Sequence, residues 1–123
     1  MQRQQQRHQA RIPAKMPTKE DDESELVFKA LANADRRKIL DQLRQAPQTT
    51  SDLCAALPRL DRTTVMQHLR VLEKARLVIT QKRGRVRWNY LDVSPIQNVY
   101  NRWIKDYAAP GADLLEKLRV RIE

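Results

Sequence analysis

The residues of this chain that could do chemistry are mainly cations, and most of its net positive charge lies in one segment. The segment from Arg59 to Tyr90 has nine basic residues against two acidic ones, so it carries +7 of the formal net charge of +9. The nine are Arg59, Arg62, Arg70, Lys74, Arg76, Lys82, Arg83, Arg85 and Arg87. Guanidinium and ammonium groups bind phosphate, and guanidinium also reads base edges. The pattern indicates a polyanionic partner, with nucleic acid as the first candidate and an anionic membrane surface as the second.

A predicted helix, capped by Asp61 and ending near Ala75, places some of these side chains on one face. Residues three and four apart share a helix face, so a polar face lies opposite an apolar stripe. The stripe consists of Val65, Leu69 and Leu72, and the polar face consists of Thr63, Gln67, Arg70 and Lys74. A positive face without acids can also be an ordinary solvated surface, so this helix alone does not separate the two interpretations.

A predicted β-hairpin after this helix carries the second group of cations. Apolar residues alternate with polar ones over 86–90, and residues 77–80 form a short apolar run, which predicts two strands. A tight turn at Arg83-Gly84 joins them, because Gly84 can adopt the positive φ that such turns require. The cations around the turn are Lys82, Arg83, Arg85 and Arg87, with no acid among them. This favours a phosphate-binding wing over a neutral surface.

Other kinds of chemistry have no support in the sequence. No carboxylate pair, nucleophile–base set or metal-ligand cluster stands out, and neither a P-loop nor a G-x-S-x-G motif occurs. Cys54, His8 and His68 together cannot supply the four ligands of a structural zinc site. We therefore expect no enzyme, no metal and no cofactor.

The sequence also lacks signals for a membrane or secreted location. No apolar stretch approaches the roughly 18 residues that suggest a membrane span. Residues 1–10 lack the apolar region of a secretory signal, and one cysteine cannot form an intrachain disulfide. We expect a cytoplasmic protein that does not bind membranes.

The elements that position the cations are predicted to be mostly helical. A chain of 123 residues suits one domain, and its composition, with two glycines, favours helices. Residues 1–24 predict a mobile tail, which could alternatively be an arm that contacts DNA. The predicted helices start at Ser24, Asp35, Thr49, Asp61, Pro95 and Asp113. The predicted fold class is mainly α with a small two-stranded β-hairpin.

Three motifs in this order resemble those of ArsR/SmtB-type bacterial transcriptional repressors. Residues 30–40, ALANADRRKIL, resemble the start of that family's domain, ALADPTRRxIL. Residues 60–78, LDRTTVMQHLRVLEKARLV, are similar to its recognition helix and following turn, and residues 82–92 resemble its wing. The resemblance covers roughly residues 25–93, and residues 95–110 resemble a branch that does not sense metals.

The resemblance implies a homodimeric repressor that binds a palindromic site in double-stranded DNA through a winged helix-turn-helix domain at 25–123. The base contacts it implies are Arg62, Thr63, Met66 and Gln67. The phosphate contacts are Arg59, Arg70, Lys82, Arg83, Arg85 and Arg87. Side-chain chemistry agrees, because arginine reads guanine and glutamine reads adenine, while Met66 could contact a thymine methyl or simply pack.

The terminal helices, by the same resemblance, would form the dimer interface. Their apolar residues exceed what a domain of this size needs for its own core, although packing within the domain is the alternative. The interface residues are Leu26, Trp103, Ile104, Tyr107, Leu114, Leu115 and Leu118.

Metal sensing does not carry over from the family. Its C-x-C site falls on Thr49 and Ser51, and the last helices contain no histidine. We expect Cys54 to be a buried structural thiol rather than a redox sensor, and His68 to pack rather than contact DNA. Arg76 replaces a glycine of the family pattern, at a cost expected to be small because a cation complements the end of a helix.

The alternative function is a winged-helix module that binds protein or RNA without sequence-specific DNA binding. The sequence names no operator, no regulated gene and no small-molecule effector.

Overall fold

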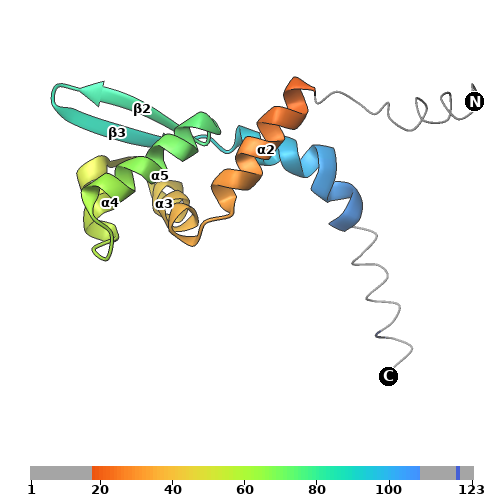
Figure 1. Ribbon diagram of the computed structural model, residues 1–123, viewed down its shortest axis with the longest axis horizontal. Coiled ribbons are helices and arrows are strands. Elements are labelled where there is room, and N and C mark those ends of the chain that lie inside the picture. Colours follow the sequence, from red (N-terminus) through yellow and green to blue (C-terminus); the bar gives the residue numbers. More distant parts are fainter. Residues whose placement is uncertain (1–17, 109–118, 120–123) are drawn as a thin grey trace, which may run out of the picture.

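The computed structural model describes residues 18–108 and residue 119, and its order of elements is that of a winged helix-turn-helix domain (Figure 1). The helices are α2 (Lys19–Leu31), α3 (Ala34–Gln45), α4 (Thr50–Ala56), α5 (Arg62–Lys74) and α6 (Ser94–Val99), and a π-helical turn, η1 (Tyr100–Ile104), continues α6. The strands are β1 (Gln48–Thr49), β2 (Val78–Arg83) and β3 (Val86–Leu91). The predicted mainly helical class is confirmed, while most of the helix predicted from Asp113 lies outside the described residues.

The sheet has three antiparallel strands in the order β1-β3-β2, which corrects the predicted two-stranded hairpin. β2 pairs with β3 along its whole length, whereas β1 adds only the pairs Gln48↔Asn89 and Thr49↔Trp88. A strand of two residues is too short to show an alternating pattern, so only its pairing partner reveals it.

Asn89 explains why β1 joins the sheet. Its side chain is 0% exposed, and Nδ2 donates to the carbonyl of Gln48 at 3.2 Å and to Oγ1 of Thr50 at 3.1 Å. A buried amide group is costly unless it is hydrogen-bonded, and these two acceptors satisfy its Nδ2, while its Oδ1 is buried without a partner among the described residues. One residue of β3 therefore holds both β1 and the start of α4.

The hairpin turn lies one residue later than predicted. Arg83 pairs with Val86, so the two-residue loop is Gly84-Arg85 and not Arg83-Gly84. Gly84 has a φ of +64°, which confirms the backbone conformation expected for it. Because β2 continues to Arg83 instead of ending at Thr80, the hairpin reaches further from the body than the sequence indicates.

Capping side chains set the starts of the helices. Thr49 and Asp52 form the predicted capping box before α4, and the Asp61 carboxylate accepts a hydrogen bond from the Thr64 N–H at 2.8 Å before α5. α2 begins at Lys19, not after Ser24, because Thr18 caps it in a further capping box. Residues 19–24, which the sequence analysis assigns to a tail, are therefore helical. The prediction was wrong because their acidic, weakly apolar composition outweighed the capping signal at Thr18.

The core lies between α3, α4, α5 and the sheet. The apolar stripe predicted for α5 is confirmed, because Val65, Leu69 and Leu72 are at most 1% exposed. Other fully buried side chains are Ile39, Leu53 and Leu77. Burial of the stripe fixes the rotation of α5 about its axis and turns the opposite face to solvent.

Arg76, in the turn between α5 and β2, has a φ of +63°. This left-handed conformation costs a residue with a side chain about 1 kcal/mol relative to glycine. The expectation that replacing the family's glycine costs little is therefore wrong. A cation does complement the end of the helix, but the turn also requires a backbone conformation that a side chain disfavours.

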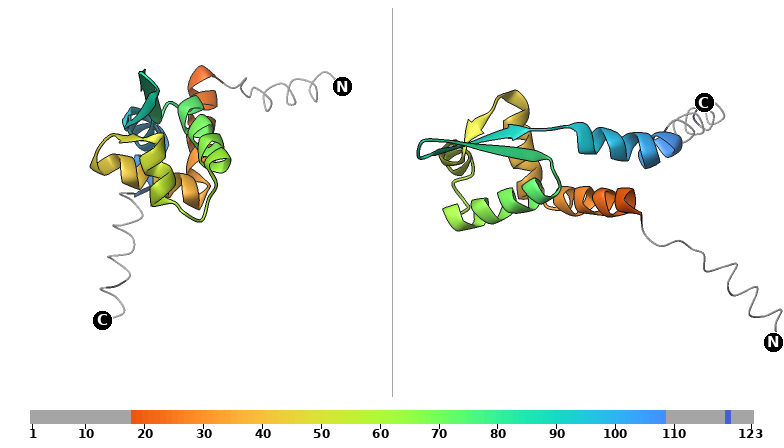
Figure 2. Two further views of the ribbon diagram at one scale, coloured as in Figure 1. Left: turned by 90° about the vertical axis from the view of Figure 1, so that its left-hand side faces the viewer. Right: turned by 90° about the horizontal axis from the view of Figure 1, so that it is seen from above.

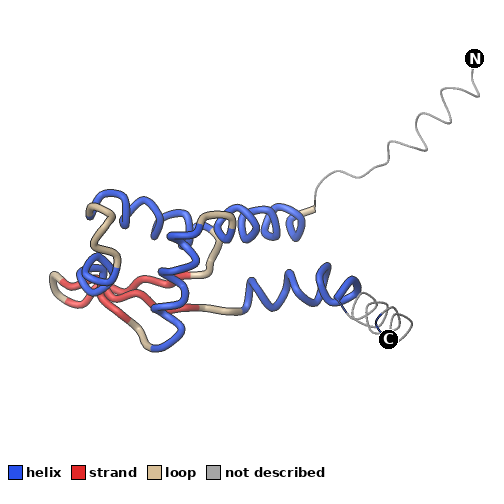
Figure 3. The backbone as a smooth tube through the Cα atoms, turned by 90° about the horizontal axis from the view of Figure 1, so that it is seen from below, coloured by secondary structure: helices blue, strands red, loops and turns tan. Residues whose placement is uncertain are grey.

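α2 and α6 extend together away from the hairpin end of the molecule, which gives it an elongated shape (Figures 2 and 3). The Arg102 side chain forms ion pairs with the carboxylates of Glu20 and Asp21. The Phe28 ring packs edge-on against Trp103, with ring centroids 5.9 Å apart. We refer to α2, α6, η1 and the helical residues 105–108 that follow η1 together as the helical arm.

Candidate nucleic-acid interface

The exposed face of α5 carries most of the residues predicted to contact bases. Arg62, Thr63, Gln67 and Arg70 are exposed, and Met66 is half-buried. This burial leaves both interpretations of Met66 open, contact with a thymine methyl or packing. No acidic residue lies in the first turn of α5, and its exposed start, which the Asp61 carboxylate caps, carries the cation Arg62.

The start of α5 is held by contacts on both sides of it. The pKa of Asp61 is lowered because its carboxylate accepts hydrogen bonds from the backbone and the side chain of Thr64, which keeps the cap ionised and in place. Arg62 Nη1 donates to Ser51 Oγ, in the first turn of α4, at 3.5 Å. Ser51 is a partner that the sequence reasoning missed. Its place in the first turn of the preceding helix is the signal that could have found it.

The wing presents its cations on both faces of the hairpin. Directly paired residues of antiparallel strands share a face, so Lys82 and Arg87 lie together, while Arg83 lies on the opposite face with Val86. Lys82, Arg83 and Arg85 are exposed, and Arg87 is half-buried. A ribbon with charge on two faces can contact phosphates in more than one orientation.

Several cations outside this surface have structural partners. Arg59, a predicted phosphate contact, forms an ion pair with Asp35, at the start of α3. Arg36 donates to the carbonyl oxygens of Ala30 at 2.8 Å and Lys29 at 2.9 Å, and Arg37 donates to that of Leu31 at 2.6 Å. These arginines donate to the last carbonyls of α2, of which that of Lys29 also accepts from the Ala32 N–H at 3.3 Å.

His68 faces α3 and not the exposed side of α5. Its Nδ1 lies 3.4 Å from Nη1 of Arg36, and the ring is half-buried. The pKa of His68 is lowered by partial burial and then by the positive charge of Arg36, against a smaller opposite effect of Asp35. A neutral ring that accepts from Arg36 supports the predicted packing role.

Cys54 is half-buried and packs against the core. This is less complete burial than the sequence predicts for a structural thiol.

The predicted dimer residues that the structure describes lie on the helical arm. Trp103 is 55% exposed and Tyr107 66% exposed, Ile104 is also exposed, and Leu26 is half-buried against the core. The Trp103 and Tyr107 rings lie 5.1 Å apart between centroids. Phe28 and Tyr100 add to this exposed apolar surface, and the sequence reasoning missed both. Leu114, Leu115 and Leu118 lie outside the described residues.

Within 18–108, no group of three or more His, Cys, Asp or Glu side chains is arranged to hold a metal ion. In the same part of the chain, no helix has both the length and the apolar character needed to cross a bilayer.

Comparison with known sequences finds regulators that share this architecture. A helix-turn-helix domain family matches residues 31–81. The chain is 33% identical over 85 residues to an uncharacterized HTH-type transcriptional regulator, YuzN, of Bacillus subtilis strain 168, a match that covers 64% of this chain and 92% of that protein. It is 27% identical over 85 residues to the transcriptional repressor SdpR of the same organism, covering 69% and 92% of the two chains.

Solved structures agree with these sequence matches. An ArsR-like transcriptional regulator from Rhodococcus sp. RHA1 superposes with a TM-score of 0.66 at 26% identity, covering 81% of this chain and 91% of that one. An ArsR family transcriptional regulator, RHA00566, gives a TM-score of 0.62 at 27% identity, covering 77% and 92%.

Proposed function

Because the chain belongs to the ArsR family of helix-turn-helix transcriptional regulators, we propose that it represses transcription by binding a palindromic site in double-stranded DNA as a homodimer. The family is one of regulators and not of enzymes, in agreement with the absence of catalytic motifs from the sequence.

One observation carries the DNA-binding proposal. The face of α5 opposite its buried stripe is exposed and basic, with no acid in the first turn. In this proposal α5 enters the major groove, where Arg62, Thr63 and Gln67 read base edges. Met66 adds a contact to a thymine methyl where the groove brings one close.

The wing supplies phosphate contacts in this proposal. Lys82, Arg83, Arg85 and Arg87 bind the backbone beside the groove, and Arg70 does so from α5. Arg59 contributes only if it exchanges its ion pair with Asp35 for a phosphate.

The homodimer is proposed from the helical arm. The rings of Phe28, Trp103 and Tyr107 form a contiguous exposed surface, Ile104 is exposed as well, and such apolar surfaces are usually covered by a partner. A second copy would repeat α5 at a fixed spacing, which matches a palindrome with half-sites about one helical turn apart or a multiple of it.

We also propose that the protein acts in the cytoplasm, and that it senses metals neither through the family's C-x-C site nor through a histidine-containing site on its last helices. Thr49 and Ser51 stand where the family's thiolate site has cysteines, and neither hydroxyl is a comparable ligand for a soft metal.

The proposal is tested by selecting DNA from a random pool with the purified protein, followed by footprinting on the enriched sequence. We expect an enriched palindrome and two protected half-sites on one face of the duplex. A pool without an enriched palindrome would contradict the proposal and favour a module that binds protein or RNA.

A further inference from the structure

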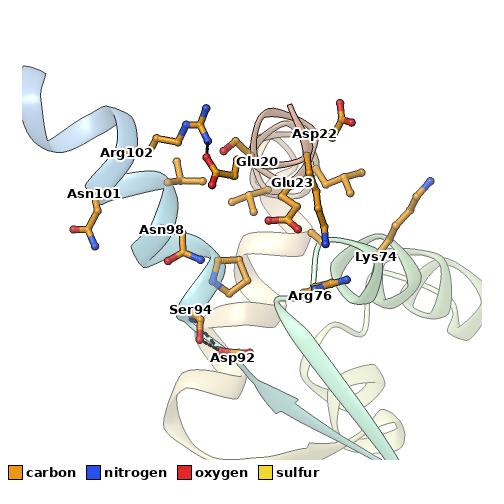
Figure 4. Close-up of a pocket in the computed structure, with 17 residues that line it drawn as sticks. Glu20, Asp22, Glu23, Lys74, Arg76, Asp92, Ser94, Asn98, Asn101 and Arg102 are labelled. Carbon is orange, nitrogen blue, oxygen red and sulfur yellow. Dashed lines mark hydrogen bonds and ion pairs between the residues drawn. The ribbon is translucent and has the colours of Figure 1, made fainter. Parts of the chain in front are cut away.

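A cavity of about 840 Å³ lies between α2, α6 and the turn that follows α5 (Figure 4). Its volume is in the range of small-molecule sites. The apolar part of its lining includes Val27 and Val99, which are almost fully buried, together with Leu26 and Pro95. None of the residues predicted to contact DNA bases or phosphates lines it.

Five charged residues that line this cavity have side chains without a partner among the described residues: Lys19, Asp22, Glu23, Lys74 and Arg76. Glu23 on α2 and Arg76 in the turn belong to its lining, and no ion pair or side-chain hydrogen bond joins either of them to another described residue. Of the other charged residues in the lining, Glu20 pairs with Arg102 and Asp92 accepts from Ser94, whereas Asp22 and Lys74 extend away from Glu23 and Arg76 (Figure 4). Figure 4 shows Glu23, Arg76 and Asn98 on three different walls.

Two backbone irregularities border the same cavity. Arg76 holds the left-handed conformation that glycine would adopt without strain. On the opposite side the π-helical turn η1 contributes Asn101 and Arg102 to the lining. Strained residues and π-helical turns are concentrated at functional sites. Here the left-handed Arg76 and the π-helical turn η1 line the same cavity, and Arg76 contributes an unpaired guanidinium to its wall.

From these observations we infer that the cavity binds a small zwitterion with an apolar body, such as an apolar amino acid or short peptide with free ends. Its ammonium group pairs with Glu23, its carboxylate pairs with Arg76, and the Asn98 amide offers a further hydrogen bond. The apolar body lies against Leu26 and Pro95, which are half-buried and so leave apolar surface open to the cavity.

The position of the cavity links the ligand to regulation, a step that rests on the proposed function. Arg76 follows the C-terminus of α5 directly, and α2 and α6 carry the proposed dimer surface. A ligand that bridges Glu23 and Arg76 therefore biases the orientation of α5 relative to the helical arm. It changes DNA affinity to the extent that its own affinity differs between the two orientations.

Isothermal titration calorimetry on the full chain without DNA tests the site. The probes are L-leucine and the dipeptide alanyl-leucine, and the controls are N-acetyl-leucine, which lacks the ammonium charge, and leucinamide, which lacks the carboxylate. We expect at least one free-ended probe to bind about tenfold more tightly than either blocked compound. Failure of both probes to bind, or equal affinity for free and blocked ends, would overturn the inference.

Variants assign the two ends of the ligand. Glu23→Gln should make leucine and N-acetyl-leucine bind equally, and Arg76→Gly should do the same for leucine and leucinamide. Arg76→Gly relieves the strained turn, so loss of binding in this variant does not reflect unfolding. Lys38→Gln removes one exposed charge from α3, outside the cavity, and should leave all affinities unchanged.

Fluorescence anisotropy with the enriched palindrome, with and without the bound probe, then tests regulation. A probe that binds but leaves DNA affinity unchanged would overturn the regulatory step alone. If the protein binds a probe but no palindrome, the proposed function is contradicted and the ligand site is not. If it binds the palindrome but neither probe, only the ligand site is contradicted.

Discussion

At the scale of single residues, the cations of this chain divide into those with protein partners and those without. Arg36, Arg37 and Arg59 bind carbonyl or carboxylate oxygens of the chain itself. Arg85, at the tip of the wing, and Arg70, on α5, are exposed. Net charge therefore overstates the charge available to DNA, and substitutions at the two kinds of position should have different effects.

Arg62 and Arg85 are expected to differ in what they contribute to DNA binding. Arg62→Ala should cost about 1 to 3 kcal/mol per half-site on the selected palindrome and relax the preference at one base pair, because it removes a base contact. Arg85→Ala should weaken binding to all sequences alike and reduce the salt slope by about one, because it removes a phosphate contact. Binding isotherms over a range of salt concentrations measure both effects. An equal loss on specific and random DNA from Arg62→Ala would contradict its assigned role.

Arg76→Gly should stabilise the protein by about 0.5 to 1 kcal/mol, because glycine adopts the left-handed conformation without steric cost. Arg76→Ala is the matched control, since it removes the same charge and keeps the strain. Urea unfolding should rank glycine above alanine, and the reverse order would show that the turn is not strained.

The lowered pKa of His68 makes the free energy of unfolding depend on pH. Because its pKa is lowered in the folded chain, the unfolded chain binds a proton more readily. The stability from neutral His68 is therefore present above its ordinary pKa of 6.5 and is lost as the pH falls through the lowered value. His68→Gln should flatten the decrease in urea midpoint between about pH 7.5 and about pH 5. An unchanged decrease would exclude His68 as its source.

At the scale of elements, local capping fixes where helices begin, whereas long-range pairing adds a strand to the sheet. Asp61 and Thr49 fix where α5 and α4 begin, each through a bond to a residue three positions later. β1 depends on Asn89, some forty residues away along the chain. The helix starts are therefore local properties, whereas the third strand is a property of the assembled domain.

Asn89→Ala should destabilise the domain by about 1 to 3 kcal/mol, because the buried Thr50 hydroxyl and the Gln48 carbonyl lose their donor. Gln81→Ala, at an exposed position of β2, is the control and should change stability by less than about 0.5 kcal/mol. Thermal or urea unfolding of both variants tests this. A similar small effect of both substitutions would mean that β1 is not held by this amide.

At the scale of the whole molecule, the surface proposed to bind DNA and the surface proposed to form the dimer lie at different ends of the domain. The hairpin lies at one end, and the helical arm with its aromatic surface extends toward the other (Figure 2). In the proposed function, DNA and the second copy bind to different surfaces. Loss of dimerisation should then weaken DNA binding without unfolding the domain.

Trp103→Glu should convert the proposed dimer to a monomer, because it places a charge in the centre of the aromatic surface. Val93→Glu, at another exposed apolar position, should leave the dimer intact. Light scattering after size-exclusion chromatography gives the mass, and circular dichroism checks the fold. A wild-type monomer, or a dimer that survives Trp103→Glu, would contradict this interface.

The sequence by itself determined the features that depend on neighbouring residues. The buried stripe of α5, the caps at Thr49 and Asp61, and the positive φ of Gly84 follow from periodicity and side-chain chemistry within a few positions. The start of α2 is local as well, but the acidic residues after Thr18 concealed it.

Only the tertiary structure decided which partners distant residues find. The pairing of Arg59 with Asp35, the Asn89 contacts that create β1, and the opposed Glu23 and Arg76 in one cavity join positions far apart in the chain. The strain at Arg76 belongs here too, because the packing of β2 against α5 fixes the turn between them. Charge and hydrophobicity patterns state what a side chain can bind, but the path of the chain determines what lies within its reach.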